Sequence, residues 1–463
     1  MLISIHLASL LIGTQDFEIA WSRRPRISIR LTSRTILLPL ILGVLVREAI
    51  APFTGHPYDF EEWIRLGYFV SAGGSPYGLI PAAPGLSMPG TGIIYSLGYP
   101  PLWAFVDAGI YSLYSLIGIN DRFLYYFLLK QPMIFGDIAD AFLIYKIVDR
   151  LGGTKGSTAF RFWLFCPFTI VISSIWGMFD QLVLTCVLLS LLGIGQTGRS
   201  MLWETLGILF KAIPVIFLPV LAFSQRNRRR VALYMITVSV LSIALILLPF
   251  LVLPGWSTSS LFQTGLDSSD KLANSMNYWV IVYTAYSYGV FPFAFTGVIK
   301  ALAFLWVPAV LAASYYCIRI ALGKRFSLRN LVLSMMFVLL VFLLTRSAVS
   351  EQFLIYFLGL GLLDCYAISQ RRFRLFNAVW LSALAFLAAN NAWFVRFLEP
   401  LSATYAGLDS TLASGALGVL RTEVTVTSAF AFTFLCVLYL RSVYNDLKAP
   451  GILPPPDPGA SNS

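Results

Sequence analysis

Charged residues are scarce in this sequence, and their scarcity excludes most soluble folds. Only 12% of the 463 residues are Asp, Glu, Lys or Arg, whereas 58% are hydrophobic. Water-soluble domains contain roughly 25% charged and about 45–50% apolar residues, so half of the expected charge is missing. The mean hydropathy of +0.77 points the same way. A soluble protein of this length could not bury so much apolar surface, and the composition predicts an integral membrane protein.

Cysteine and histidine are too few or too scattered for most metal and nucleophile chemistry. The five cysteines stand singly in apolar runs: Cys166, Cys186, Cys317, Cys365 and Cys436. Such a set argues against a disulfide framework or a zinc site. The only histidines are His6 and His56, and the sequence has no Gly-rich phosphate loop. We therefore expect the cysteines to be packing residues.

The net charge of +11 is concentrated in short basic clusters between apolar segments. The clusters are Arg23, Arg24, Arg26, Arg30 and Arg34; Arg226, Arg228, Arg229 and Arg230; Lys324, Arg325 and Arg329; and Arg371, Arg372 and Arg374. Basic residues in short loops mark the cytoplasmic side of membrane proteins. This pattern argues against a nucleic-acid partner and predicts contact with membrane lipids.

Apolar segments of about 20 residues are long enough to cross the hydrocarbon core as helices. The segments that qualify are 35–52, 123–148, 158–176, 178–195, 231–254, 299–320, 328–346, 352–368, 375–394 and 423–441. Two further segments, 201–223 and 277–297, are ambiguous. An unpaired backbone is not tolerated in lipid, so the spans must be helical. We expect an all-α, polytopic bundle of roughly 10–13 membrane helices.

The basic clusters also predict how the chain is organised. We expect three parts: a basic cytoplasmic N-terminus at 1–34, a single membrane domain at 35–445 and a disordered cytoplasmic tail at 446–463. Residues 53–122 then form a long first loop on the outer side. All clusters fall inside if 201–223 enters the membrane and returns, breaking near Lys211, and if 277–297 stays on the outer side.

Three acids follow the first span within a few residues of each other: Asp59, Glu61 and Glu62. A carboxylate with aromatic and apolar neighbours loses hydration and becomes a better base near neutral pH. A solvated acidic turn is the plain alternative for these residues.

Other acids lie inside apolar runs or at their ends. Asp137 and Asp140 are three residues apart, so they share one face of the second span. Asp180 lies at the outer end of a helix. Charges at membrane depth cost about 2.5 kcal/mol or more and mark a functional pathway or a paired partner. Pairing of the first two with Lys130 or with a neighbouring helix is the structural alternative.

Two cations are candidates for binding an anion. Lys211 is the lone cation of its apolar run, and a helix broken beside Pro214 would offer backbone donors as well. Neutralisation of Lys211 by a buried aspartate is the alternative. Arg346 and Glu351 lie at the outer mouth of a helix pair, where Arg346 could bind an anionic headgroup or anchor the helix at the interface.

Several short motifs, in order, resemble the GT-C superfamily of membrane glycosyltransferases. After the acidic motif come Ser75-Pro76-Tyr77, Tyr99-Pro100-Pro101-Leu102, Gly136-Asp137-Ile138-Ala139-Asp140, Trp176-Gly177-Met178-Phe179-Asp180, Phe210-Lys211-Ala212-Ile213-Pro214 and Val349-Ser350-Glu351-Gln352-Phe353. The first two resemble the catalytic subunit of GPI mannosyltransferase I and its prokaryotic relatives. Tyr99–Leu102 also resembles the dolichyl-phosphate-glucose glucosyltransferases. In Trp176–Asp180, Met178 stands where the Trp-Gly-Gln-Phe-Asp element of the GT-C superfamily has Gln.

The resemblance implies an inverting hexosyltransferase that uses a dolichyl- or polyprenyl-phosphate sugar. A first-loop acid would act as base on the acceptor hydroxyl, and the spacing to Ser75 gives this role to Asp59. Glu61 is the second acid of an Asp-x-Glu pattern, where Asp-x-Asp is more usual. This departure leaves a divalent cation (Mg or Mn) undecided, and no other cofactor is expected.

The remaining roles implied by the resemblance concern substrate binding. Lys211 and Arg346 would hold the donor phosphate. The residues expected to contact the substrates or shape the acceptor pocket are Asp137, Asp140, Asp180, Glu351, Glu62 and Tyr99. The resemblance favours mannose over glucose, with a lipid-linked glycan or glycolipid as acceptor, and leaves room for a small accessory membrane subunit.

Two other functions fit parts of the sequence. A secondary transporter would explain intramembrane acids, a lysine and a broken helix, but it predicts internal repeats, and none is seen. A lipid-flipping protein or scaffold leaves the buried charges unexplained. With no endoplasmic-reticulum retrieval signal visible, we expect a prokaryotic cell membrane, with both termini cytoplasmic.

Overall fold

The computed structural model describes residues 34–88, 97–225, 227–262, 275–287, 289–290, 296–322 and 327–448. All regular elements in these ranges are helical. The expected basic N-terminus, apart from Arg34, and the expected tail beyond residue 448 lie outside the described residues. Arg226, Lys324 and Arg325 of the basic clusters do so as well.

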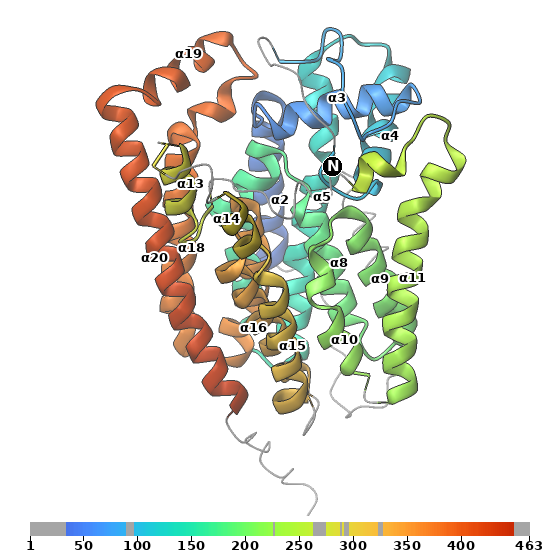
Figure 1. Cartoon of the computed structure of the whole chain (residues 1–463), viewed down its shortest axis with the longest axis vertical. Helices are drawn as coiled ribbons and strands as arrows, with labels where there is room; N and C mark the ends of the chain where they lie inside the picture. The colour runs from blue at the N-terminus through green and yellow to red at the C-terminus, as the bar shows by residue number, and fades with distance from the viewer. Residues whose placement is uncertain are drawn as a thin grey trace, which may run out of the picture.

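The helices alternate between long rods and short, broken pieces (Figure 1). In chain order they are α2 (Arg34–Ile50), η1 (Ala51–Phe53), α3 (Asp59–Ser71), α4 (Leu102–Ile117), α5 (Arg122–Arg150), α6 (Gly156–Phe165), α7 (Pro167–Ile170), η2 (Val171–Trp176), α8 (Asp180–Leu192), α9 (Thr197–Phe210), η3 (Ile213–Ile216), α10 (Leu218–Phe223), α11 (Arg228–Val252), α13 (Val280–Ser287), α14 (Thr296–Ala303), α15 (Trp306–Cys317), η5 (Ile318–Leu322), α16 (Leu328–Thr345), η6 (Glu351–Phe353), α17 (Leu354–Leu363), η7 (Asp364–Ile368), η8 (Gln370–Arg372), α18 (Phe373–Asn390), η9 (Ala392–Leu398), α19 (Ala403–Leu412) and α20 (Gly415–Lys448).

Seven of the described helical segments are long and apolar enough to cross a membrane, and the bent pair of α6 with α7–η2 would be an eighth. The bundle is thus all-helical and polytopic, as predicted. Other predicted spans are helical but do not meet this criterion. Helix α5 carries Lys130, Asp137 and Asp140, α8 has only 13 residues, and α9 stops at Phe210.

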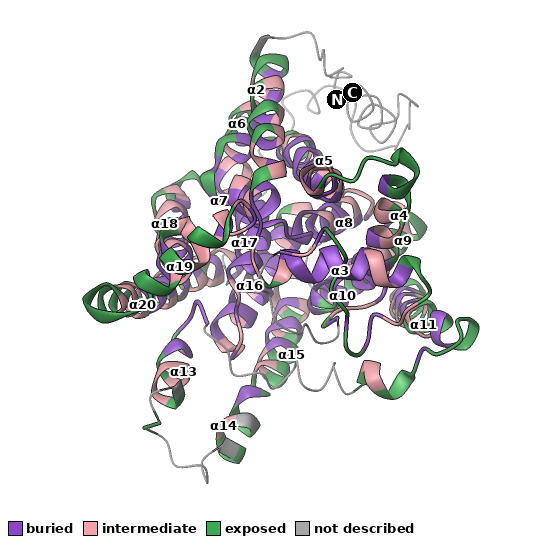
Figure 2. Ribbon diagram, turned by 90° about the horizontal axis from the view of Figure 1, so that it is seen from above, coloured by how far each residue is buried: buried purple, intermediate pink, exposed green. Residues whose placement is uncertain are grey.

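The most deeply buried elements form the centre of the bundle. Figure 2 shows α5, α8, α16 and α17 in the middle, with α11 and α20 at the periphery. Every residue of α17 is buried, whereas many apolar side chains of α11 and α20 are exposed. Burial of the apolar faces against α5 and α16 orders the centre, while lipid can cover the outer helices.

The two ambiguous segments are both interrupted. Helix α9 ends at Phe210, Lys211 is extended (φ −158°, ψ 139°), and the short η3 and α10 follow, so the break predicted near Lys211 is present. Pro214 contributes to it because proline cannot donate a backbone hydrogen bond. Within 277–297, the described residues form only the eight-residue α13 and the start of α14.

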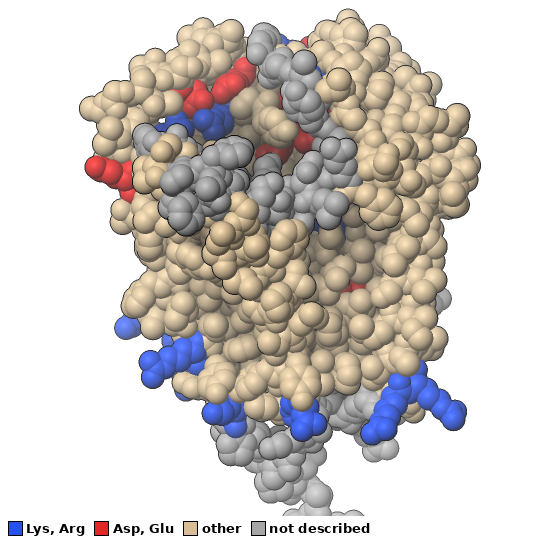
Figure 3. Space-filling view, viewed as in Figure 1, with Lys and Arg blue, Asp and Glu red and all other residues tan. Residues whose placement is uncertain are grey.

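The first loop forms a small helical layer at one end of the bundle, which we call the loop end. Helices α3 and α4 lie there, and α3 lies across the end of the bundle when viewed from above (Figures 1 and 2). Exposed Lys and Arg side chains instead mark the opposite rim, which we call the basic end (Figure 3).

A buried ion cluster ties η7, η8 and α20 together toward the basic end. Arg372 pairs with the carboxylate of Asp364 and, at 2.6 Å, with Asp446. Tyr439 donates a further hydrogen bond of 2.6 Å to Asp364. Asp364 is fully buried, whereas the neighbouring Arg371, which pairs with Asp446, is 67% exposed on its side chain.

This contrast gives a matched test of stability. Arg372→Met leaves Asp364 as a buried charge without its cation, and we expect the free energy of unfolding to fall by about 3–5 kcal/mol. Arg371→Met removes only an exposed pair and should cost about 0–1 kcal/mol. Unfolding of the two purified variants in detergent measures the difference. Equal losses in the two variants would contradict a structural role for the buried cluster.

Candidate functional site

Asp59 lies at the first turn of α3, where the chain turns away from the first span. Trp176 donates a hydrogen bond of 2.9 Å from Nε1 to Asp59 Oδ2. The His56 ring stacks on Trp176, and its Nδ1 accepts a hydrogen bond of 3.2 Å from the Asp59 amide. The Asp59 side chain is 21% exposed. Asp59 is therefore held in a defined orientation but remains reachable.

A buried lysine connects the two segments that converge on Asp59. Lys130 donates hydrogen bonds to the carbonyl oxygens of Ala51 (3.0 Å) and Thr54 (2.6 Å), just before Asp59, and of Ser174 (2.8 Å), just before Trp176. Its ammonium also lies 4.7 Å from the centre of the Phe60 ring. Lys130 thus fixes the Asp59 loop against η2.

Gly177 completes this junction because no other residue fits there. Its backbone is left-handed (φ +87°), and a Cβ atom would lie 2.5 Å from the Phe60 ring. The Gly177 carbonyl also accepts a hydrogen bond of 3.1 Å from Nε1 of Trp63. Only glycine adopts this backbone conformation readily and allows such close contact.

The other two acids of the first loop lie differently. Glu61 is fully buried, and it pairs with Arg65 at 2.6 Å and accepts a hydrogen bond of 2.8 Å from the Met88 amide. These contacts hold α3 against the rest of the first loop. Glu62 is 5% exposed and is close enough to interact electrostatically with Tyr99.

Lys211 is paired with Asp180, the alternative that the sequence left open. Its Nζ atom lies 2.9 Å from both carboxylate oxygens of Asp180, and Tyr356 donates a hydrogen bond of 2.9 Å to the same carboxylate. The ammonium also lies 4.8 Å from the centre of the Tyr99 ring. The charges of the pair largely cancel, and its geometry is fixed.

Arg346 has no such partner among the residues that the structure describes. Its guanidinium lies between 5.4 and 5.6 Å from the ring centres of Trp306, Phe342 and Phe353. No carboxylate of the described residues lies within ion-pair distance of it. Lys211 lies 5.0 Å from the same Phe353 ring, so the two cations are neighbours.

Tyr99 connects this cationic side of the site to Asp59. Burial raises the pKa of the Tyr99 hydroxyl well above its usual range, and the charges of Asp59, Asp180 and Glu62 raise it further, whereas Arg346 lowers it. The Tyr99 carbonyl accepts a hydrogen bond of 2.8 Å from the Tyr77 hydroxyl, which joins two of the sequence motifs. The hydroxyl of Tyr99 is therefore within electrostatic range of four charged residues, which we call the cluster around Tyr99: Asp59, Glu62, Asp180 and Arg346.

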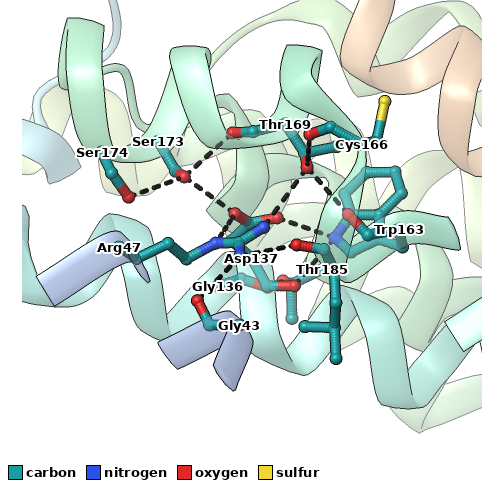
Figure 4. A network of polar contacts seen from close by, with 11 residues as sticks. Gly43, Arg47, Gly136, Asp137, Trp163, Cys166, Thr169, Ser173, Ser174 and Thr185 are labelled. Carbon is teal, nitrogen blue, oxygen red and sulfur yellow. Dashed lines mark hydrogen bonds and ion pairs between the residues drawn. The ribbon is translucent and has the colours of Figure 1, made fainter. Parts of the chain in front are cut away.

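Asp137 lies in a separate network inside the bundle (Figure 4). Arg47 pairs with it at 2.6 Å, Trp163 donates a hydrogen bond of 2.7 Å, and Ser173 donates one of 2.8 Å. All of these side chains are buried. Sequence reasoning missed Arg47, although a lone arginine near the end of the first span was a signal for an internal partner.

Asp140 is one turn further along α5. It accepts a hydrogen bond of 2.7 Å from Thr185 of α8. Neither Asp137 nor Asp140 interacts with Asp59 or Arg346 in any contact of the described residues. The structure therefore does not bring these two acids into the cluster around Tyr99.

Glu351 is the first residue of η6, which follows the turn after Arg346. It interacts electrostatically with Asp59 and accepts a hydrogen bond of 2.7 Å from Asn390. The adjoining turn of η9 has three consecutive left-handed residues that are not glycine: Ala392, Trp393 and Phe394. Each costs about 1–3 kcal/mol, and such strain is concentrated at functional sites. Sequence reasoning gave no signal for this turn.

No three His, Cys, Asp or Glu side chains among the described residues are placed to hold a metal ion. Glu61, the second acid of the Asp-x-Glu pattern, contacts Arg65 instead.

Comparison with known proteins gives no family for the chain. No protein-family model matches it, and no curated protein is significantly similar in sequence. The assignment of function therefore depends on the geometry of the site.

The environment of His56 predicts a pH dependence of stability. Burial lowers the pKa of His56 from 6.5 to about 4, so the folded protein binds its proton less tightly than the unfolded chain. Stability from this group is complete above pH 6.5 and is lost as the pH falls toward 4, by up to about 3 kcal/mol. Thermal unfolding between pH 4 and 7 should show this slope, and His56→Asn should flatten it. An unchanged slope in the variant would contradict the prediction.

Proposed function

We propose that the chain is a membrane glycosyltransferase that transfers a hexose from a polyprenyl-phosphate sugar to a glycan or glycolipid acceptor. One observation carries this proposal. Asp59 is a reachable carboxylate one helical turn before Trp63, whose ring packs on the half-buried Tyr99 at 6.1 Å. Lys211 lies against both the Tyr99 ring and the Phe353 ring on which Arg346 packs, and Arg346 has no carboxylate partner among the described residues. A base and an anion site are thus combined in one cluster, which is what transfer from a phosphate-linked sugar needs.

Asp59 is the proposed general base. It takes the proton of the acceptor hydroxyl while the acceptor oxygen bonds to the anomeric carbon of the sugar. The bond from that carbon to the phosphate oxygen breaks, and the phosphate keeps the electron pair. Trp176 holds one carboxylate oxygen of Asp59, and the other makes no hydrogen bond to the described residues. A single carboxylate opposite the leaving group gives inversion at the sugar.

Arg346 is the proposed site for the donor phosphate. A guanidinium presents several N–H groups in a plane and matches phosphate oxygens in pairs. Fixed in place, it stabilises the negative charge that develops on the leaving phosphate. Lys211 is less available because Asp180 occupies it. We propose that this pair orients Tyr99 and the neighbouring rings, while Arg346 supplies most of the uncompensated charge.

The surface charges support an orientation in the membrane. Lys and Arg side chains gather on the rim of the basic end, while acidic side chains, with some basic ones beside them, are visible in a hollow toward the loop end (Figure 3). The positive-inside rule then assigns the basic end and both termini to the cytoplasm, and Asp59 to the outer face. A lipid-borne donor can reach such a site from the bilayer. Mannose and a prokaryotic cell membrane remain our preferred sugar and location.

Asp59→Asn tests the base directly. We expect sugar transfer to fall by at least about 10²-fold, because the amide cannot accept the proton. Purified protein with polyprenyl-phosphate mannose, or the glucose equivalent, and a membrane lipid extract provides the assay. Asp121→Asn is the matched control: Asp121 caps α5 by accepting a hydrogen bond of 2.8 Å from Leu124, and asparagine caps equally well. Full activity of Asp59→Asn would refute the assignment.

Arg346→Gln tests the anion site. We expect kcat/KM for the donor to fall by about 10²–10³-fold, the usual effect of removing a donor that stabilises developing charge. Arg122→Gln is the control, since Arg122 lies at the same end of the bundle and, among the described residues, packs on Phe123 and donates a hydrogen bond to the Leu401 carbonyl. Substrate uptake by proteoliposomes without any sugar transfer would favour the transporter instead.

A further inference from the structure

The end of α16, from which Arg346 emerges, is held by a segment far away in sequence. Asn277 donates hydrogen bonds of 2.8 Å from Nδ2 to the carbonyl oxygens of both Leu343 and Arg346. Carbonyl groups at a helix C-terminus lack partners within the helix. Asn277 therefore satisfies two of these groups at the point where the chain leaves α16.

Asn277 is itself fixed. Its Oδ1 atom accepts hydrogen bonds of 3.0 Å from the Trp279 amide and from the Ser275 hydroxyl. The side chain is completely buried. Both donor positions and both acceptor positions of the amide are thus occupied, so its orientation is determined.

The neighbouring residues extend the contact to the turn after Arg346. The Val349 amide donates a hydrogen bond of 3.0 Å to the Ser275 hydroxyl, and the Met276 amide donates one of 2.9 Å to the Val349 carbonyl. We call residues 275–277 the clamp. It holds both ends of the turn 346–349 through three hydrogen bonds, and a fourth reaches Leu343 in the last turn of α16. Ser275 and Met276 are fully buried as well.

The clamp determines where the guanidinium of Arg346 lies. The backbone of Arg346 is extended (φ −72°, ψ 137°), so a small rotation at the helix end would move its side chain by several ångströms. The Nε atom donates a hydrogen bond of 3.1 Å to the Ala348 carbonyl within the clamped turn. The two terminal amino groups make no hydrogen bond to the described residues, so the turn and the rings of Trp306, Phe342 and Phe353 orient the guanidinium.

We infer that Asn277 is a positioning residue for the anion site at Arg346, and that the 275–277 clamp orients its guanidinium toward a lipid-borne phosphate. This inference depends on the proposed role of Arg346. Asn277 does not touch the substrate in this account. It acts through the backbone of residues 343–349, which makes it separable from the general base and from the acceptor site.

Asn277→Asp is the sharpest test because the two side chains have the same shape. The new carboxylate cannot donate, so it repels the carbonyl oxygens of Leu343 and Arg346 and releases the turn. We expect kcat/KM for the donor to fall by about tenfold or more, while KM for the acceptor changes by less than about twofold. The inhibition constant of sugar-free polyprenyl phosphate should rise by the same factor as the donor effect.

Two other variants keep the test interpretable. Asn377→Asp is the matched control, because within the described part of the chain the Asn377 side chain accepts a hydrogen bond of 2.9 Å from Trp380 and donates none, and a carboxylate can still accept it. If Asn277→Asp does not fold, Ser275→Ala removes only the hydroxyl of the clamp and should give a smaller effect in the same direction. Unchanged donor kinetics in a folded Asn277→Asp would overturn the inference.

Thermal stabilisation by polyprenyl phosphate separates this inference from the proposed function. The lipid should raise the Tm of the wild type, raise it less in Asn277→Asp, and not raise it in Arg346→Gln. If this pattern appears without any transfer activity, the anion site and its clamp stand and the enzymatic proposal fails. If transfer depends on Arg346 but Asn277→Asp binds the lipid normally, the proposed function stands and the clamp fails.

Discussion

The buried ammonium of Lys130 is the interaction on which the geometry at the loop end depends. It is surrounded by carbonyl and hydroxyl oxygens of the first span's end and of η2, with no carboxylate partner among the described residues. A charge away from water is tolerated only when its donors are satisfied, so these segments must meet at Lys130. Asp59 follows one segment and Trp176 follows the other, so the same contact determines how the carboxylate and its indole donor face each other.

Most of the other buried charges in the bundle cancel in pairs. Asp137 pairs with Arg47, Asp180 with Lys211 and Asp364 with Arg372, each with further hydrogen bonds from neighbouring side chains. Such pairs fix helices relative to each other but leave little charge for a ligand. Asp59 and Arg346 are not neutralised in this way: among the described residues neither has a close ion pair with an oppositely charged side chain, and Asp59 is also 21% exposed, whereas Asp137, Asp180 and Asp364 are fully buried. The candidate site is therefore defined as much by what is left unpaired as by the motifs that surround it.

The sequence predicted the parts of the structure that depend on local pattern. Apolar runs predicted the helical bundle, and the lysine and proline of 201–223 predicted the break at Lys211. Pairing over long distances was not predictable: Arg47 and Asp137 are 90 residues apart, and nothing in either segment identifies the other. The pairing of Glu61 with Arg65 was predictable from the sequence, since Arg65 follows Glu61 by one helical turn. The left-handed turn of η9 could not be predicted, because its three residues include no glycine or asparagine, the residues that usually adopt this conformation. Activity, sugar and orientation remain proposals.

Gly177 has a consequence for how the site tolerates change. It lies against the ring of Phe60, the residue directly after Asp59. Adding a single methyl group there would push on an aromatic ring that is wedged against the ammonium of Lys130. A displaced Phe60 would in turn shift the preceding residue, Asp59, and its carboxylate. Gly177 carries no functional group, yet its small size helps to determine where the carboxylate of Asp59 lies.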